Sequence, residues 1–101
     1  MNFQQHNPPH PGVLIQRTYI DPFKEMTANG IADKLGMAQS TFSRLLNGKS
    51  GNSPEMAVRL SSVLGGSAES WLALQRSFDL HKARQIVDAS ALERIDFSRV
   101  A

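Results

Sequence analysis

The stretch 27–49, TANGIADKLGMAQSTFSRLLNGK, decides the fold because it describes two short helices joined by a tight turn. Thr27 is a suitable N-cap for a first helix that ends at residue 35. Gly36 follows it, and glycine adopts the left-handed backbone conformation that such a helix ending requires. After a three-residue turn, a second helix is expected over 39–46. This spacing predicts a helix-turn-helix.

The second helix of this pair has an apolar face and a polar face. At 100° per residue, Phe42, Leu45 and Leu46 lie on the side that packs inward. The opposite side carries polar and basic residues and no carboxylate, as a helix in the major groove of DNA requires. An ordinary solvated helix face would have the same polarity. The residues expected to read bases are Gln39, Ser40, Thr41, Ser43 and Arg44. Those expected to hold phosphates are Asn47, Lys49 and the Gly48 amide.

Helix signals continue on both sides of this stretch. An apolar stripe over 12–21 follows Pro11 and ends before Pro22. Ser53-Pro54-Glu55 is typical of a helix start, and the helix it opens should run over 54–64. Ser67 caps a fifth helix that should reach about residue 84.

The chain is therefore expected to be all-α, since no segment alternates with a period of two. We expect an irregular N-terminal arm over 1–10, a five-helix domain over 11–84 and a C-terminal extension over 85–101. A weak apolar pattern between 86 and 95 would allow one short extra helix in that extension.

Composition narrows the class of protein. The chain has 101 residues, which suits one domain, and 41% hydrophobic with 20% charged residues is typical of a globular protein. It has no cysteine, no signal-peptide pattern and no apolar run long enough to span a bilayer, so a cytoplasmic location and no membrane contact are expected. The net charge of +2 permits a local basic patch on a nucleic acid.

The residues give no sign of catalysis or of a bound cofactor. There is no nucleophile elbow around a serine and no paired carboxylates in a pocket-forming pattern. His6 and His10 are four residues apart, but Pro8 and Pro9 prevent the helix that would align their rings, and His81 is isolated. We therefore expect that the protein is not an enzyme and that it binds neither a metal ion nor a cofactor.

The chain resembles the HigA antitoxin family of type II toxin–antitoxin modules, with a helix-turn-helix of the phage-repressor (Cro/cI, XRE) class. The resemblance covers about residues 10–84 and rests on His10-Pro11-Gly12, Asp21-Pro22, the helix-turn-helix, Ala57-x-Arg59-Leu60, Leu64-Gly65, the run 67–75 SAESWLALQ and Phe78-Asp79-Leu80. It implies a protein that binds double-stranded operator DNA, represses its own operon and neutralises a cognate ribonuclease-type toxin by direct binding.

Two alternatives remain open. The family usually has Gln-x-Glu in the first turn of the second helix, where this chain has Ala28 and Gly30. That departure favours a module that binds the toxin and has lost its affinity for an operator. A stand-alone transcriptional regulator of the XRE type, with no toxin partner, is the other alternative.

A homodimer is expected because one short recognition helix makes too few base contacts for useful specificity. Two-fold pairing doubles these contacts and places the two recognition helices about 34 Å apart, in successive major grooves. The fifth helix carries more apolar surface than a small core needs, so Trp71, Leu74 and Phe78 are the expected dimer contacts.

Overall fold

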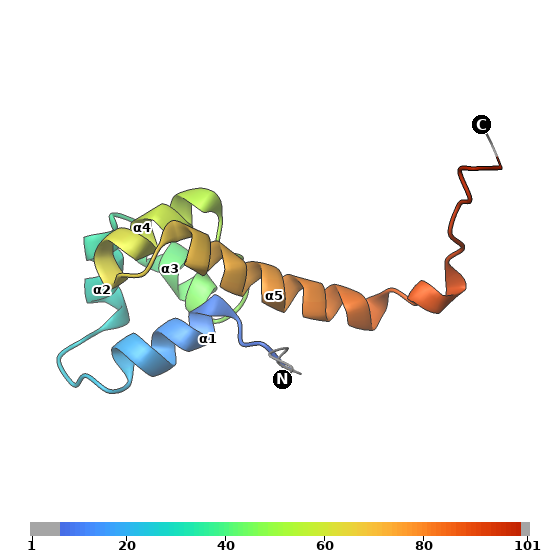
Figure 1. Cartoon of the computed structure of the whole chain (residues 1–101). Coiled ribbons are helices and arrows are strands. Elements are labelled where there is room, and N and C mark those ends of the chain that lie inside the picture. Colours follow the sequence, from blue (N-terminus) through green and yellow to red (C-terminus); the bar gives the residue numbers. More distant parts are fainter. Residues whose placement is uncertain (1–6, 100–101) are drawn as a thin grey trace.

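The computed structural model describes residues 7–99, and this part of the chain contains helices and no strand. The predicted all-α architecture is confirmed (Figure 1). The helices are α1 (Pro11–Ile15), α2 (Ala28–Leu35), α3 (Gln39–Leu46), α4 (Pro54–Leu64) and α5 (Ala68–Ile86).

The first predicted helix is divided into two parts. Its first turns are α-helical, but Gln16–Ile20 form a π-helical turn, in which the Asp21 N–H donates to the Gln16 carbonyl at 2.9 Å. The Gln16 amide group also donates to the Asp21 carboxylate at 2.8 Å, which stabilises this wider turn. The apolar stripe predicted the helical segment correctly, but it does not distinguish an α turn from a π turn.

The predicted helix boundaries are confirmed where side chains cap them. The Thr27 hydroxyl accepts from the Gly30 N–H at 3.0 Å, and Gly36 ends α2 with φ of 70°. Ser53 caps α4 in the same way. Ser67 and Ser70 cap α5 reciprocally, since each side chain accepts from the backbone N–H of the other.

The core is formed where α1 to α4 pack together against the first turn of α5. The inner faces predicted for α2 and α3 are buried, and Phe42 and Leu45 are among the most deeply buried side chains. The buried hydrophobic residues are Ile15, Ile31, Ala32, Leu35, Phe42, Leu45, Ala57, Leu60 and Trp71.

Trp71 corrects the predicted dimer contacts. Its side chain is 4% exposed, and the indole N–H donates to the Gly65 carbonyl at 2.9 Å. The indole therefore fills the core of its own chain, and it cannot contribute an exposed surface to a second copy. Leu74 and Phe78 are half-buried.

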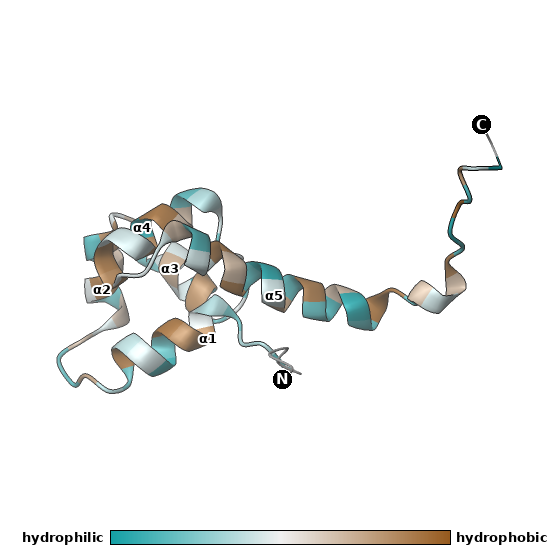
Figure 2. Ribbon diagram, viewed as in Figure 1, coloured by the Kyte–Doolittle hydropathy of each residue, from teal (hydrophilic) through white to brown (hydrophobic). Residues whose placement is uncertain are grey.

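The C-terminal half of α5 extends away from the other helices, so that the chain measures 62 × 27 × 26 Å (Figure 1). Residues 82–99 are all exposed, including the hydrophobic Ile86, Leu92 and Phe97. Figure 2 shows hydrophobic positions along this extended part of the chain, away from the other helices. The short extra helix is reduced to a single 3-10 turn, Ala89–Ala91, because the backbone of Val87 is extended and ends α5. Within 7–99, no helix has the length and apolar character needed to cross a bilayer.

Candidate nucleic-acid interface

The polar face of α3 is open to solvent along its whole length. All seven side chains predicted to contact DNA are exposed, while Phe42 and Leu45 hold the opposite face against the core at 1% and 0% exposure. α3 has no acidic residue, so no carboxylate on it would repel a phosphate. The structure therefore brings these seven residues together on one surface: Gln39, Ser40, Thr41, Ser43, Arg44, Asn47 and Lys49.

The N-terminus of α3 differs from those of α2, α4 and α5. Its N-cap is Ala38, which has no side chain to accept a hydrogen bond, whereas Thr27, Ser53 and Ser67 cap the other three helices. The first N–H groups of α3 thus have no side-chain acceptor. Backbone N–H groups at a helix start favour anions, so a DNA phosphate could complete this end of the helix.

The loop after α3 differs from the prediction at Gly48. The Gly48 N–H donates to the Leu45 carbonyl at 3.1 Å, and the Lys49 N–H donates to the Arg44 carbonyl at 2.9 Å. Both amides close the end of α3, so the predicted phosphate contact of the Gly48 amide is wrong. Gly48 instead supplies a φ of 72°, which lets the chain turn sharply there. The side chains of Asn47 and Lys49 stay exposed.

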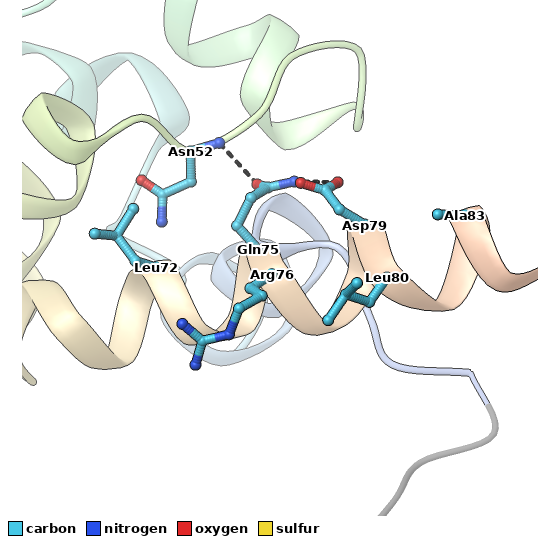
Figure 3. Close-up of a pocket in the computed structure, with 7 residues that line it drawn as sticks. All are labelled: Asn52, Leu72, Gln75, Arg76, Asp79, Leu80 and Ala83. Atoms are coloured by element: carbon cyan, nitrogen blue, oxygen red, sulfur yellow. Dashed lines mark hydrogen bonds between the residues drawn. The ribbon is translucent and has the colours of Figure 1, made fainter. Parts of the chain in front are cut away.

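The same loop is fastened to α5 by buried amide groups (Figure 3). The Asn52 N–H donates to the Gln75 side-chain oxygen at 2.7 Å, and the Asn52 amide donates to the Trp71 carbonyl at 2.9 Å. Gln75 in turn donates to the Asp79 carboxylate at 3.0 Å. Sequence reasoning missed this network, although Gln75 lies four residues after Trp71 and therefore on the same inner face of its helix.

Arg59 on α4 holds the turn between α2 and α3. One nitrogen of its guanidinium donates to the carbonyls of Leu35 and Gly36, at 2.8 and 3.1 Å. These are carbonyls at the end of a helix, which have no partner within the helix. Arg59 thus fixes the turn that sets the angle between the two helices.

A groove of about 490 Å³ runs along α5, beside the loop that contains Asn52 (Figure 3). Its lining combines apolar side chains and two amides with one basic and one acidic side chain, which lie about one turn of helix apart. The groove is lined by Asn52, Leu72, Gln75, Arg76, Asp79, Leu80 and Ala83. Over residues 7–99, no three histidine or acidic side chains lie close enough together to hold a metal ion, and His6 lies outside that range.

Comparisons with known proteins agree with this geometry. The helix-turn-helix family HTH_3 matches residues 24–71. The uncharacterized HTH-type transcriptional regulator YddM of Escherichia coli (strain K12) is 42% identical over 89 residues, which cover 88% of this chain and 93% of YddM.

Solved structures extend the likeness to nearly the whole chain. The antitoxin GraA is 35% identical with a TM-score of 0.76, over 88% of this chain and 98% of GraA. GraA in complex with its operator has a TM-score of 0.73 at 31% identity, over 95% of this chain and 98% of that one. The Pseudomonas aeruginosa antitoxin HigA, solved with the higBA promoter, has a TM-score of 0.74 at 26% identity, over 89% of this chain and 97% of the HigA chain.

The fold, the exposed polar face of α3 and these likenesses agree with one another. The chain belongs to the helix-turn-helix (HTH_3) family, and its XRE-type domain has the fold of the HigA and GraA antitoxins.

Proposed function

We propose that this protein is an antitoxin that binds operator DNA as a dimer, represses its own operon and neutralises a cognate ribonuclease-type toxin by direct binding. The observation that carries the DNA-binding part is the exposed face of α3, where polar and basic side chains gather without a carboxylate. GraA and HigA, which share this fold, were solved with an operator and a promoter.

Two classes of contact are proposed on this face. Gln39 at the start of α3 can present both its amide oxygen and its amide nitrogen to an adenine edge. Arg44 lies halfway along the helix, where its planar guanidinium suits a guanine or a phosphate. Lys49 follows the helix and acts as a point charge for a phosphate.

These classes predict different effects on binding. Lys49→Ala should weaken binding to every DNA sequence alike and lower the salt slope by about one. Gln39→Ala should cost about 1–3 kcal/mol on the operator and little on random DNA. The probe for a mobility shift is the palindrome ahead of the gene. A wild type that gives no shift at low salt, or two variants that both bind unchanged, would refute the DNA-reading role.

For the dimer, the groove side of α5 is the proposed contact. Leu80 is 43% exposed, and Arg76 and Asp79 lie beside it. In a two-fold antiparallel pair of α5 helices, Arg76 of one copy would lie near Asp79 of the other, so the same pair of opposite charges would form twice in the dimer. Leu72 would pack toward Ala83 of the second copy in the same arrangement.

Leu80→Asp tests this contact because the side chain is exposed and not part of the core. It should turn the dimer into a monomer in sedimentation at tens of micromolar and leave the helical circular dichroism unchanged. Val58→Asp is the matched control, since Val58 is 56% exposed on α4. A wild type that sediments as a monomer, or a Leu80→Asp variant that stays dimeric, would contradict this assignment.

The toxin partner is proposed from the antitoxin relatives. A stand-alone regulator is the second candidate, and its support is the 42% identity to YddM, which is named an uncharacterized HTH-type transcriptional regulator. The neighbouring reading frame separates the two: a small basic protein that co-purifies with this chain and loses ribonuclease activity in the complex supports the antitoxin.

A module that binds a toxin but no operator is the remaining alternative. In its favour, the first turn of α2 offers Ala28, half-buried against the core, and no long polar side chain.

A further inference from the structure

His10 is a buried histidine at the meeting point of three elements. Its side chain is 5% exposed, and its Nδ1 accepts the Gly12 N–H at 2.9 Å, which caps α1. Its ring meets the Phe78 ring of α5 edge to face, with centroids 4.9 Å apart. On the third side lies the loop after α3.

That loop passes beside the His10 ring at Gly48 and Ser50. A Cβ placed on Gly48 would lie 3.8 Å from the ring, so the loop backbone passes directly beside it. The backbone of Ser50 also lies close enough to the His10 ring to influence its protonation. Because Nδ1 accepts from the Gly12 N–H, the proton of the neutral ring is on Nε2.

The residues after His10 bring the same segment against the recognition helix. Pro11 is fully buried, and the Gly12 backbone lies so close to α3 that a Cβ there would be 1.9 Å from the Leu45 carbonyl oxygen. The His10-Pro11-Gly12 segment therefore touches both the last turn of α3 and the loop that follows it. These are the parts that the proposed function places against DNA.

We propose that His10 is a positioning residue for the DNA-binding surface: in its neutral form it caps α1 and keeps the His10-Pro11-Gly12 segment against the end of α3, and its protonation removes that cap. This inference rests on the proposed operator binding. It makes operator affinity fall as the pH falls, because an imidazolium has no acceptor for the Gly12 N–H.

The surroundings of His10 favour the neutral ring. Burial lowers the pKa of His10 below its ordinary value of 6.5, and this effect outweighs the influence of the Ser50 backbone, which raises it. The charged groups that act on the ring both lie on α5: Asp79 raises the pKa and Lys82 lowers it. Lys82 also lies over the Phe78 ring, 5.5 Å from its centroid.

His10→Asn separates positioning from simple packing. Asparagine is a good helix N-cap, so the variant can keep the bond to the Gly12 N–H, but it has no group that titrates near neutral pH. His81→Asn is the matched control, because His81 lies on α5 and its only hydrogen bond within 7–99 is to Gln85.

The experiment measures operator affinity by fluorescence anisotropy between pH 7.5 and pH 5.0 at constant ionic strength. Wild type and His81→Asn should lose affinity by about fivefold, the factor that corresponds to one lost helix cap. His10→Asn should not lose affinity. General protonation works in the opposite direction, since added positive charge strengthens binding to DNA. Parallel profiles for wild type and His10→Asn would overturn the proposal.

A second measurement needs neither DNA nor a variant. In ¹⁵N-resolved NMR spectra of the wild type, the amide resonances of Gly12 and Gly48 should shift with pH, with the same midpoint as the titration of the His10 ring. If the Gly48 resonance does not follow that midpoint, the titration of His10 does not reach the DNA-binding surface. A protein that passes this test and binds no operator at any pH would refute the proposed function and leave the contact between His10 and the loop intact.

Discussion

Gly12→Ala is a substitution for which two physical effects predict opposite signs. Gly12 is in the first turn of α1, where alanine is ordinarily favoured over glycine by up to about 1 kcal/mol. At this position, however, the new Cβ would lie 1.9 Å from the Leu45 carbonyl oxygen and 2.8 Å from the Leu46 Cα. Both are backbone atoms of α3, so no side chain can rotate to make room.

The steric effect should exceed the gain in helix propensity. Contacts of a real Cβ begin at about 3.0 Å, so α1 would have to withdraw from α3 by about 1 Å. That movement separates Ile15 from the buried face that contains Leu45, both of which are 0% exposed. Overpacking costs about 1–3 kcal/mol, and a clash with backbone atoms at this distance should reach the upper end of that range, so about 2 kcal/mol of destabilisation remains after the gain of about 1 kcal/mol in helix propensity. For a domain of this size, Tm should fall by about 8–16 °C.

The assay is urea and thermal unfolding followed by circular dichroism. Gly51→Ala is the control, because a Cβ at Gly51 would lie 3.4 Å from the Gln75 side chain, an ordinary contact distance. Its Tm should stay within a few degrees of the wild type. If Gly12→Ala proves as stable as the wild type or more stable, the helix-propensity effect dominates and α1 does not pack closely on α3.

Three further predictions concern stability. Leu45→Ala should lower the free energy of unfolding by about 2–5 kcal/mol, because Leu45 is 0% exposed and its truncation leaves a cavity. An unchanged urea midpoint would show that the inner face of α3 is assigned wrongly. The folded state lowers the pKa of His10, so the stability that neutral His10 contributes is complete above pH 6.5 and is lost as the pH falls below that value. Tm measured against pH should show this loss in the wild type and not in His10→Asn. A chain that ends at Val87 should keep the wild-type Tm, because residues 88–99 are all exposed; a drop of more than a few degrees would mean that this segment packs on the domain.

The fold could be predicted because its signals are local. Thr27, Ser53 and Ser67 each accept a hydrogen bond from an N–H three residues further along, so the capping residue and its partner stand close together in the sequence. The exposed face of α3 follows in the same way, since a period of 3.6 residues places Phe42 and Leu45 on the opposite side.

The errors lie where local patterns allow more than one outcome. An apolar Trp71 on a helix face can fill the core of its own chain or meet a second chain, and only the position of Gly65 beside it shows that it does the former. The Gly48 amide could have faced a phosphate, but the last turn of α3 uses it. Both results depend on the path of a loop, which hydrophobic periodicity does not describe.

By itself, the sequence determined the helices, their boundaries and the polar surface of α3, because each depends on residues within one or two turns of one another. Only the tertiary structure decided what holds that surface in place. The bonds from Asn52 to Gln75 and from Arg59 to Leu35 join residues 23 and 24 positions apart, and His10 meets Phe78 across a still longer separation. Such pairs leave no periodic trace in the chain, since they form only when the packing of the core brings distant segments together.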